Sequence, residues 1–391
     1  MTAPLPLAGV RVISLAQQYP GPFATMMLAD LGADVVLVER PGTGDPARAF
    51  PGFFHAMARG KRSVALDLKC DAGRAAMRRL IAGADVLLEG FRPGTMTRLG
   101  LGPEVLLPDQ PGLVYVSISG FGQTGPNRAR PGHDLTYQAE AGMLYQHLPP
   151  SPPPEAPALA LGDLSAGMFA VQAALLGLVG RSRTGRGGYY DISMADCLTT
   201  LLAAHAGPVL NASGPPGFPY EPGYGVFVTS DGEYLALGIA HEDPFWRALC
   251  DVTGLESERD LDASARRAEH ERLAGLLSVA IARRSATDWE QTLATADVPY
   301  GRVRSLADLP GTAQSRARGL FTSPDGPTGA VNVRQPLVID GTAPGPARGA
   351  PALGEHTVQV LHEAGLAADV IAGLVASGAA ADGAAQAGGT R

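Results

Sequence analysis

The stretch that decides the fold is "GVRVISLAQQYPGPFATMMLADLGADVVLVE", residues 9–39. Its two ends, residues 9–16 and 34–39, are nearly continuous apolar runs rich in β-branched residues, as expected of strands buried on both faces. Between them, residues 22–32 show helical spacing and end in a glycine. A strand, a helix and a second strand in this order predict one unit of a parallel α/β sheet.

The same alternation continues along the first 120 residues. Residues 85–89 and 113–119 are two further apolar runs, and residues 72–83 show helical spacing with a closing glycine. After the proline-rich segment 147–157, residues 163–180 predict a strongly apolar helix that Asp163 opens. The first half of the chain is therefore predicted to be an α/β sheet domain.

A change of composition marks a second domain, as a length of 391 residues suggests. The Gly/Pro cluster at residues 206–225 indicates a linker. Beyond it, residues 224–238 contain two strand-like runs around a "SDG" turn, and helical patterns follow to about residue 318. We expect a smaller α/β domain there and a frayed C-terminal tail.

Composition limits the classes of function. Charged residues make up 18% and apolar residues 45%, which is typical of a folded globular protein. A net charge of −7 argues against nucleic acid or an anionic membrane as the main partner. The N-terminus shows no basic region before a long apolar run, and we expect neither a signal peptide nor a membrane span. The cysteines have no spacing that suggests zinc or disulfides, so a reducing cytoplasm is the expected compartment: they are Cys70, Cys197 and Cys250.

A glycine-rich segment imitates a dinucleotide fingerprint. "GFGQTG" at residues 120–125 follows a predicted strand, but Pro126 and a polar loop come next where the fingerprint requires a helix. We therefore interpret it as a turn and do not expect NAD. The first strand-to-helix turn, residues 16–24, is the better candidate for a ligand loop in an open sheet.

The candidates for catalytic chemistry are His133, Asp134 and Asp163. Each aspartate begins an apolar-periodic segment, and capping is the usual role of a single aspartate at a helix start. A lone histidine is also more often structural than catalytic. Together, however, a histidine and a carboxylate held ionised at a helix N-terminus provide two bases near neutral pH. Such a pair suggests proton transfer on both faces of one carbon, if His133 and Asp163 meet in space.

Nearly the whole chain resembles the family III CoA-transferases, which include formyl-CoA and carnitine CoA-transferases and α-methylacyl-CoA racemases. The resemblance rests on residues 9–45 and on a series of shorter motifs: "ARGKRSVALDLK", "DVLLEGFRPGTMTRLGLG", "YVSISGFGQTGP", "RPGHD", "GDLSAGMFA", "RSRTGRGGYYDISMAD", "SDGEYLALG" and "GEHT". It implies a Rossmann-like, parallel-sheet large domain built from both chain ends, a smaller inserted α/β domain and an interlocked homodimer.

The resemblance also implies domain limits and ligands. They are a large domain over 1–205, a linker over 206–224, a small domain over 225–318, a return to the large domain over 319–380 and a flexible tail over 381–391. The substrates would be acyl-CoA thioesters, with coenzyme A bound as part of the substrate and no metal or separate cofactor.

Position by position, the family's CoA-binding residues match five residues of this chain: Arg40, Leu68, Lys69, Arg92 and Tyr137. Arg40 and Arg92 would hold the phosphates, because a guanidinium offers paired donors to phosphate oxygens. Leu68 and Lys69 would lie beside the adenosine, and Tyr137 near the CoA chain. By itself, either arginine is more often a solvated surface residue, and a buried helix position explains the tyrosine equally well.

The family divides by chemistry at the residues singled out above. In its transferases the aspartate that matches Asp163 attacks the thioester; in its racemases that aspartate and a histidine matching His133 exchange the C2 proton of a 2-methylacyl-CoA. His133 and the lack of a "GGGG" loop favour the racemase, whereas the "QAEAG" pattern of residues 138–142 is closer to transferases. Glu242 matches the racemase glutamate that supports the histidine only with one extra residue, and His241 occupies the ungapped position.

We therefore predict a racemase in which a backbone N–H near Asp134 stabilises the enolate oxygen. A CoA-transferase is the alternative, and a CoA-binding protein without catalysis is a third class.

Overall fold

The computed structural model describes residues 4–144, 156–213, 221–323, 330–345 and 348–384. Most of the proline-rich segment 147–157, residues 214–220 of the expected linker and residues 385–391 of the expected tail lie outside the described residues. The chain divides into two compact units, which we call the large unit (Met1–Ala203 with Gln314–Arg391) and the small unit (Ala204–Ala313).

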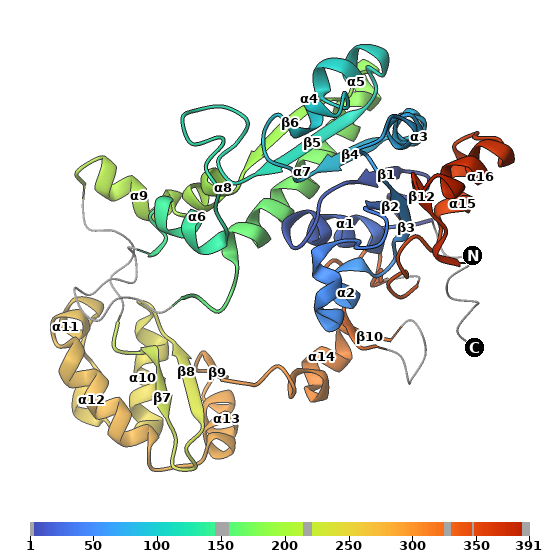
Figure 1. Cartoon of the computed structure of the whole chain (residues 1–391). Coiled ribbons are helices and arrows are strands. Elements are labelled where there is room, and N and C mark those ends of the chain that lie inside the picture. Colours follow the sequence, from blue (N-terminus) through green and yellow to red (C-terminus); the bar gives the residue numbers. More distant parts are fainter. Residues whose placement is uncertain (1–3, 145–155, 214–220, 324–329, 346–347, 385–391) are drawn as a thin grey trace. The chain divides into compact units, whose positions relative to one another are not determined.

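A seven-stranded sheet forms the centre of the large unit (Figure 1), in the order β12-β3-β2-β1-β4-β5-β6. Strands β1 to β6 run parallel, and β12 pairs antiparallel with β3 at one edge. The strands are β1 (Arg11–Ser14), β2 (Asp34–Glu39), β3 (Arg62–Leu66), β4 (Val86–Glu89), β5 (Val114–Ser119), β6 (Gly188–Ser193) and β12 (Ala380–Ala381). This confirms the predicted parallel α/β sheet, in the strand order 3-2-1-4-5-6 of dinucleotide-binding folds.

Helices cover both faces of this sheet, because successive strand residues point to opposite sides. On one face, Val12 and its neighbours pack against α1 (Pro20–Asp30) and α7 (Leu161–Thr184). On the other, Ile13 belongs to a cluster that includes residues of α3 (Asp71–Ala82), α15 (Thr357–Glu363) and α16 (Ala368–Ala376). The C-terminal helices thus complete a domain that the N-terminal strands begin.

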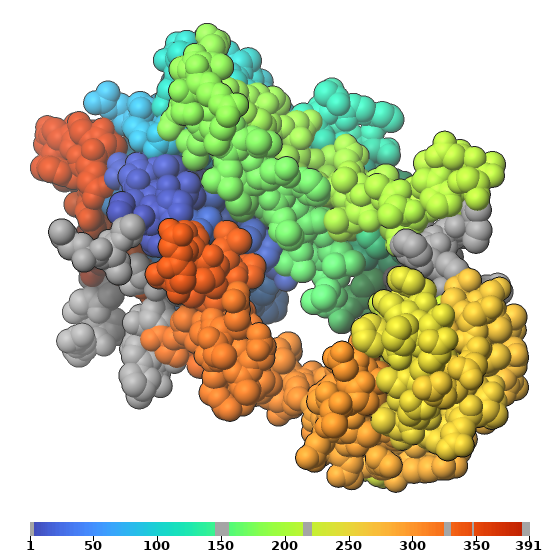
Figure 2. Space-filling view, turned by 180° about the vertical axis from the view of Figure 1, so that it is seen from behind, coloured from blue at the N-terminus to red at the C-terminus, as the bar shows by residue number. Residues whose placement is uncertain are grey.

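Helix α7 is long and strongly apolar. By length and composition it could cross a membrane, and 44% of its apolar window is buried inside the unit. Its small residues let it lie close to its neighbours: a Cβ on Gly167 would meet Phe23 Cδ1 at 2.8 Å, and one on Gly177 would meet Val114 Cγ1 at 2.4 Å. The helix therefore packs as a layer over the sheet. Figure 2 shows the outer residues of this helix in green.

Short elements complete the large unit. A buried ion pair between Arg59 and Asp30 at 2.8 Å, with a further bond from Arg59 to the carbonyl of Val333, holds the returning segment against α1. The remaining elements are η1 (Pro46–Ala49), α2 (Pro51–Ala58), α4 (Thr95–Arg98), α5 (Pro103–Asp109), α6 (Asp134–Glu140), α8 (Met194–Leu201), α14 (Ala313–Ala317), β10 (Phe321–Thr322) and β11 (Asn332–Val333).

The small unit has an antiparallel sheet in the order β7-β8-β9, with helices packed on a core that contains Trp246 and Trp289. Gly232, with φ +77°, makes the turn between β7 and β8 in the predicted "SDG". Its elements are α9 (Ala203–Leu210), β7 (Tyr224–Val228), β8 (Tyr234–Gly238), α10 (Asp243–Thr253), η3 (Glu256–Glu258), α11 (Ala263–Ala268), α12 (His270–Ile281), α13 (Ala286–Thr295), β9 (Tyr300–Arg302) and η4 (Leu309–Gly311).

Two expected boundaries are wrong. Residues 206–210 of the expected linker belong to α9, which contains Pro208 within its last turn. Ala381, placed in the tail, pairs with Ala65 of β3 because the extended chain satisfies the open edge of the sheet.

Candidate active site

A pocket of about 540 Å³ opens at the carboxyl edge of the sheet, where the strand order reverses between β1 and β4. The loops that follow β1, β4 and β5 line it, together with the first residues of α6 and α7. Ligands of open α/β sheets bind at this kind of switch point. Gln17, Gln18 and Tyr19, in the loop after β1, line the pocket as predicted for the first strand-to-helix turn.

Asp163 lies in the first turn of α7, at its third residue, and lines the pocket. The helix begins at Leu161 after Ala160, so Asp163 is not the N-cap residue that the sequence suggested. Burial, and then the charge of Asp134, raise the pKa of Asp163 to about 7. A helix N-terminus favours the ionised form, but here desolvation and a second carboxylate outweigh it. The carboxylate accepts no hydrogen bond from the described residues.

The carboxylate of Asp134 holds the first turn of α7, and with it Asp163, in place. Oδ1 of Asp134 accepts hydrogen bonds from the N–H groups of Gly162 at 2.6 Å and Asp163 at 3.2 Å, and Oδ2 accepts one from Gln138 at 2.5 Å. A Cβ on Gly162 would approach Oδ1 of Asp134 to 2.8 Å, so glycine makes room for the contact. Asp134 therefore caps the following helix α7 rather than its own, and its side chain acts as a positioning group.

His133 is the N-cap residue of α6, the role that the sequence gave to Asp134. Its main-chain N–H donates to Thr136 Oγ1 at 3.1 Å, and Thr136 Oγ1 donates back to the carbonyl of His133 at 2.7 Å. The side chain is exposed and lines the same pocket as Asp163. The structure thus brings together the two groups that are 30 residues apart in the sequence.

Tyr137 also lines this pocket, although its exposed fraction is only 6%. Its ring packs edge-on against Phe121, and a Cβ on Gly120 or Gly132 would lie within 2.6 Å of a ring atom. The glycines of "GFGQTG" and "RPGHD" are therefore needed to seat this tyrosine. Residues 126–133, between Gly125 and α6, form a loop, whereas a dinucleotide fingerprint requires a helix directly after its last glycine.

Apart from Tyr137, which lies in α6, the predicted CoA-binding residues follow parallel strands at the carboxyl edge. Arg92 follows β4 and lines the pocket. Arg40 follows β2 and is exposed; Leu68 and Lys69 follow β3, with Leu68 half-buried against the core and Lys69 exposed. Arg40, Leu68 and Lys69 are not among the residues that line the pocket. Their contact with CoA stays a prediction.

Glu242 lies in the small unit, as the N-cap residue of α10. Its Oε2 accepts hydrogen bonds at 3.0 Å from the N–H groups of Ala240 and His241, and these bonds lower the pKa of the carboxyl group. The carboxylate is thus engaged by its own loop. That Glu242 or His241 supports His133 stays a prediction.

The sequence reasoning missed Asp45, which holds the backbone of Gln18 in the loop after β1. Gln18 has a φ of +62°, which is unfavourable for a residue with a side chain. Its N–H donates to both carboxylate oxygens of Asp45 at 3.1 Å, and Asp45 is buried. Oε1 of Glu39 in turn accepts from the N–H of Asp45 at 2.8 Å. The buried acids hold the active-site loop, and the positive φ is visible only in the structure.

Among the residues that the structure describes, no group of three His, Cys, Asp or Glu side chains could hold a metal ion. The cysteines Cys70, Cys197 and Cys250 are unpaired.

Comparison with known proteins places these features in a family. The family model described as CoA-transferase family III matches residues 7–357. A succinate–glutarate CoA-transferase of Agrobacterium fabrum is 34% identical over 383 residues, covering 92% of this chain and 95% of that protein. An alpha-methylacyl-CoA racemase of Mus musculus is 36% identical over 378 residues, covering 93% and 95%.

A solved structure agrees with the fold. A CAIB/BAIF family protein from Brucella suis superposes with a TM-score of 0.83 at 32% identity, covering 93% of this chain and all of that one (100%). The relatives by sequence include both CoA-transferases and racemases, so membership of the family is compatible with either reaction.

Proposed function

Since this chain belongs to CoA-transferase family III and its relatives are acyl-CoA enzymes, we propose that it racemises 2-methylacyl-CoA thioesters by proton transfer at C2. The observation that carries the proposal is the pairing of His133 and Asp163 in one pocket, with the pKa of Asp163 raised to about 7. A base is most effective when its pKa is near the working pH, and the raised pKa of Asp163 meets this condition.

The reaction needs one base on each face of C2. With Asp163 ionised and His133 protonated, the carboxylate takes the C2 proton and the electron pair of the C–H bond forms the enolate. The imidazolium then gives a proton to the opposite face, which leaves Asp163 protonated and His133 neutral, the state that catalyses the reverse reaction. The enolate oxygen would accept a hydrogen bond from the N–H of Asp134, the first residue of α6, which has no acceptor among the described residues.

Five further residues would bind the substrate. Arg40 and Arg92 would bind the CoA phosphates, with Leu68 and Lys69 beside the adenosine and Tyr137 near the pantetheine arm. The chain would act as an interlocked homodimer in the cytoplasm, without nucleic acid or membrane as a partner. Light scattering on the purified protein tests the dimer, and a mass of 40.3 kDa, that of one chain, would contradict it.

The experiment is exchange of the C2 proton. Each enantiomer of a 2-methylacyl-CoA is incubated with the enzyme in deuterated water, and deuterium at C2 and inversion are followed by mass spectrometry and chiral analysis. We expect both, and a fall of about 100-fold or more in His133→Ala and in Asp163→Asn. His362→Ala, which removes an exposed histidine of α15, is the matched control and should retain full exchange. Absence of exchange with both short and long acyl chains would rule out the racemase reaction.

A specific observation keeps a CoA-transferase as the second candidate. The carboxylate of Asp163 has a raised pKa and no hydrogen-bond partner among the described residues, which also suits a nucleophile. Its oxygen would attack the thioester carbonyl, and CoA thiolate would leave to give an anhydride. The thiolate would then attack the aspartyl carbonyl, releasing the acid and leaving CoA on Asp163. Hydroxylamine added with acyl-CoA should then modify Asp163, and an unmodified Asp163 after turnover rules this reaction out.

A further inference from the structure

A tyrosine in the loop after β1 has no role in the proton transfer described above. Tyr19 lines the catalytic pocket and is half-buried. Its hydroxyl group has no hydrogen-bond partner among the described residues. Tyrosine hydroxyl groups that are withdrawn from water usually find a partner in the protein, so a free one in a pocket is available as a donor to a ligand.

The fold holds the side chain of Tyr19 from both directions of the chain. Before it, Gln18 keeps its positive φ because the buried Asp45 accepts from its N–H. After it, the carbonyl of Tyr19, the N-cap residue of α1, accepts from the N–H of Phe23 at 2.8 Å. The Tyr19 ring packs edge-on against Phe53, with ring centroids 5.0 Å apart and an interplanar angle of 85°. An unfavourable backbone is thus maintained beside a side chain with a fixed orientation, as is common at functional sites.

The hydroxyl group of Tyr19 lies on the side of the pocket that holds the two acids. Burial raises the pKa of Tyr19 above its usual value of 10.0, and the charges of Asp163 and Asp134 raise it further. Interaction between charges falls with distance, so both carboxylates are near this ring. The phenol therefore keeps its proton at neutral pH and can donate it in a hydrogen bond. Asp163 does not take this bond, because its carboxylate accepts none from the described residues.

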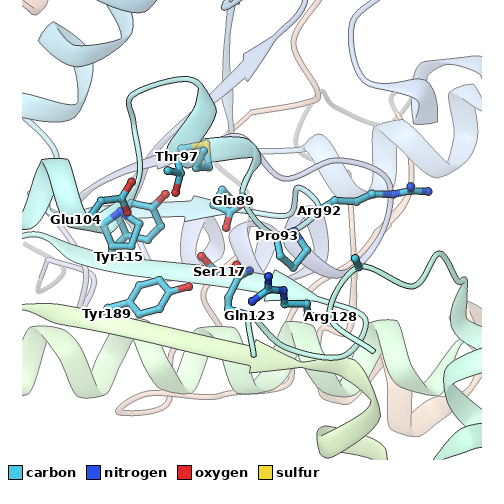
Figure 3. Close-up of a pocket in the computed structure, with 14 residues that line it drawn as sticks. Glu89, Arg92, Pro93, Thr97, Glu104, Tyr115, Ser117, Gln123, Arg128 and Tyr189 are labelled. Atoms are coloured by element: carbon cyan, nitrogen blue, oxygen red, sulfur yellow. The ribbon is translucent and has the colours of Figure 1, made fainter. Parts of the chain in front are cut away.

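The other tyrosines described at this edge of the sheet are placed differently. Tyr137 lines the same pocket, but the charge of Arg92 acts on it together with that of Asp163, so it lies towards the predicted phosphate-binding side. Figure 3 shows Tyr115 and Tyr189 in a neighbouring cavity of about 440 Å³, where both hydroxyl groups have partners. Among these described tyrosines, Tyr19 is the donor that lies beside both acids.

The chemistry requires a donor at this place. The carbonyl carbon of a thioester is bonded directly to C2, so its oxygen stays near Asp163 when C2 lies against that base. The oxygen becomes negatively charged in the enolate, and fixed donors that point to it lower the barrier. The N–H of Asp134 supplies one donor, and an oxyanion can accept more than one hydrogen bond.

We infer that the Tyr19 hydroxyl group donates a hydrogen bond to the thioester oxygen of the bound substrate and is a catalytic residue, the second oxyanion donor beside the N–H of Asp134. The phenolic proton stays on Tyr19, so the transfer of the C2 proton between Asp163 and His133 is unchanged. The inference rests on the proposed function for the position of the thioester in the pocket.

The first test is spectroscopic and does not depend on turnover. Pivaloyl-CoA, which has no proton at C2, is prepared with an isotope-labelled carbonyl group, and its stretching band is recorded by infrared difference spectroscopy on the full-length protein at saturation. A hydrogen bond weakens the carbonyl bond, so we expect a lower wavenumber in the unaltered protein than in Tyr19→Phe. Tyr234→Phe, which removes the hydroxyl group of an exposed tyrosine in β8, is the matched control and should not move the band.

The second test is kinetic. In Tyr19→Phe we expect kcat for C2 exchange of a 2-methylacyl-CoA to fall about tenfold or more, whereas KM changes by less than about threefold, because the bond strengthens as the oxygen gains charge. A merely structural role of Tyr19 does not move the carbonyl band, and Tyr234→Phe should retain full kcat.

The outcomes separate this inference from the proposed function. A carbonyl band at the same wavenumber in the unaltered protein and in Tyr19→Phe overturns the inference, even if both proteins exchange the C2 proton. A shifted band with unchanged kcat overturns the catalytic role of Tyr19. A shifted band in a protein that exchanges no C2 proton supports the contact between Tyr19 and the thioester and rules out the racemase reaction.

Discussion

Replacing the candidate base should stabilise the folded protein at neutral pH. Asp163 has an ordinary pKa of 3.8, and burial together with Asp134 raises it to about 7 in the folded state. Asp163→Asn keeps the size of the side chain but cannot ionise. We therefore expect this variant to lose exchange activity and to gain stability above the folded pKa, as is common where function requires an unfavourable group.

The magnitude follows from linkage. The folded protein keeps the Asp163 proton between pH 3.8 and about 7, whereas the unfolded chain has lost it. The free energy of unfolding contributed by this group therefore falls as the pH rises through that window, and is constant above it. Between about pH 5 and about pH 8 the fall covers about two units, or about 2.7 kcal/mol at 1.36 kcal/mol per unit. Because the side chain is only half-buried, we expect about 1–3 kcal/mol after screening by solvent.

The assay compares thermal and urea unfolding of the unaltered protein and Asp163→Asn at about pH 5 and about pH 8. The difference between the two proteins isolates this group, because all others titrate in both. Asp288→Asn is the matched control: Asp288 is also the third residue of its helix, α13, but it is exposed. A gain for Asp163→Asn that is no larger at pH 8 than at pH 5 would refute the reasoning.

Other variants test the groups around this site. Asp134→Asn removes the charge that helps to raise the pKa of Asp163. The acid limb of the pH–rate profile should move to lower pH by less than about 1.5 pH units, because burial is the larger cause of the raised pKa. An unmoved acid limb would show that the charge of Asp134 does not affect the pKa of Asp163. Asp45→Ala removes the acceptor of the Gln18 N–H, and we expect kcat to fall about tenfold while Asp45→Asn retains most of it; equal kcat values in steady-state assays of both variants would argue against a positioning role. Burial lowers the pKa of Lys61 to about 7 from 10.5, so the contribution of Lys61 to the free energy of unfolding rises with pH across that window. Lys61→Met should therefore stabilise the protein more at about pH 6 than at about pH 9 in thermal melts. A larger stabilisation at about pH 9 would contradict the lowered pKa.

The sequence indicated the fold because its signal is local. Residues 9–16 and 34–39 are apolar runs typical of strands buried on both faces, and they contain β1 and β2. The same holds for the helix between them, whose spacing and closing glycine lie within one segment. Residue type and motif indicate His133 and Asp163, and the structure places both at one pocket.

The tertiary structure decided what each group does there. Asp134 was expected to cap the helix that it begins, yet its carboxylate binds the N–H groups of Gly162 and Asp163, about 30 residues away. The bond from Gln18 to Asp45 also depends on how separate loops meet.

By itself, the sequence determined which segments form the sheet and which residue types are available at its carboxyl edge, because periodicity and turn chemistry act over a few neighbouring residues. Only the tertiary structure decided that the pKa of Asp163 is raised to about 7 and that Glu89, Ser117 and Gln123 share a cavity. Desolvation and charge coupling depend on atoms that surround a group in space, and chain folding brings those atoms from distant parts of the sequence.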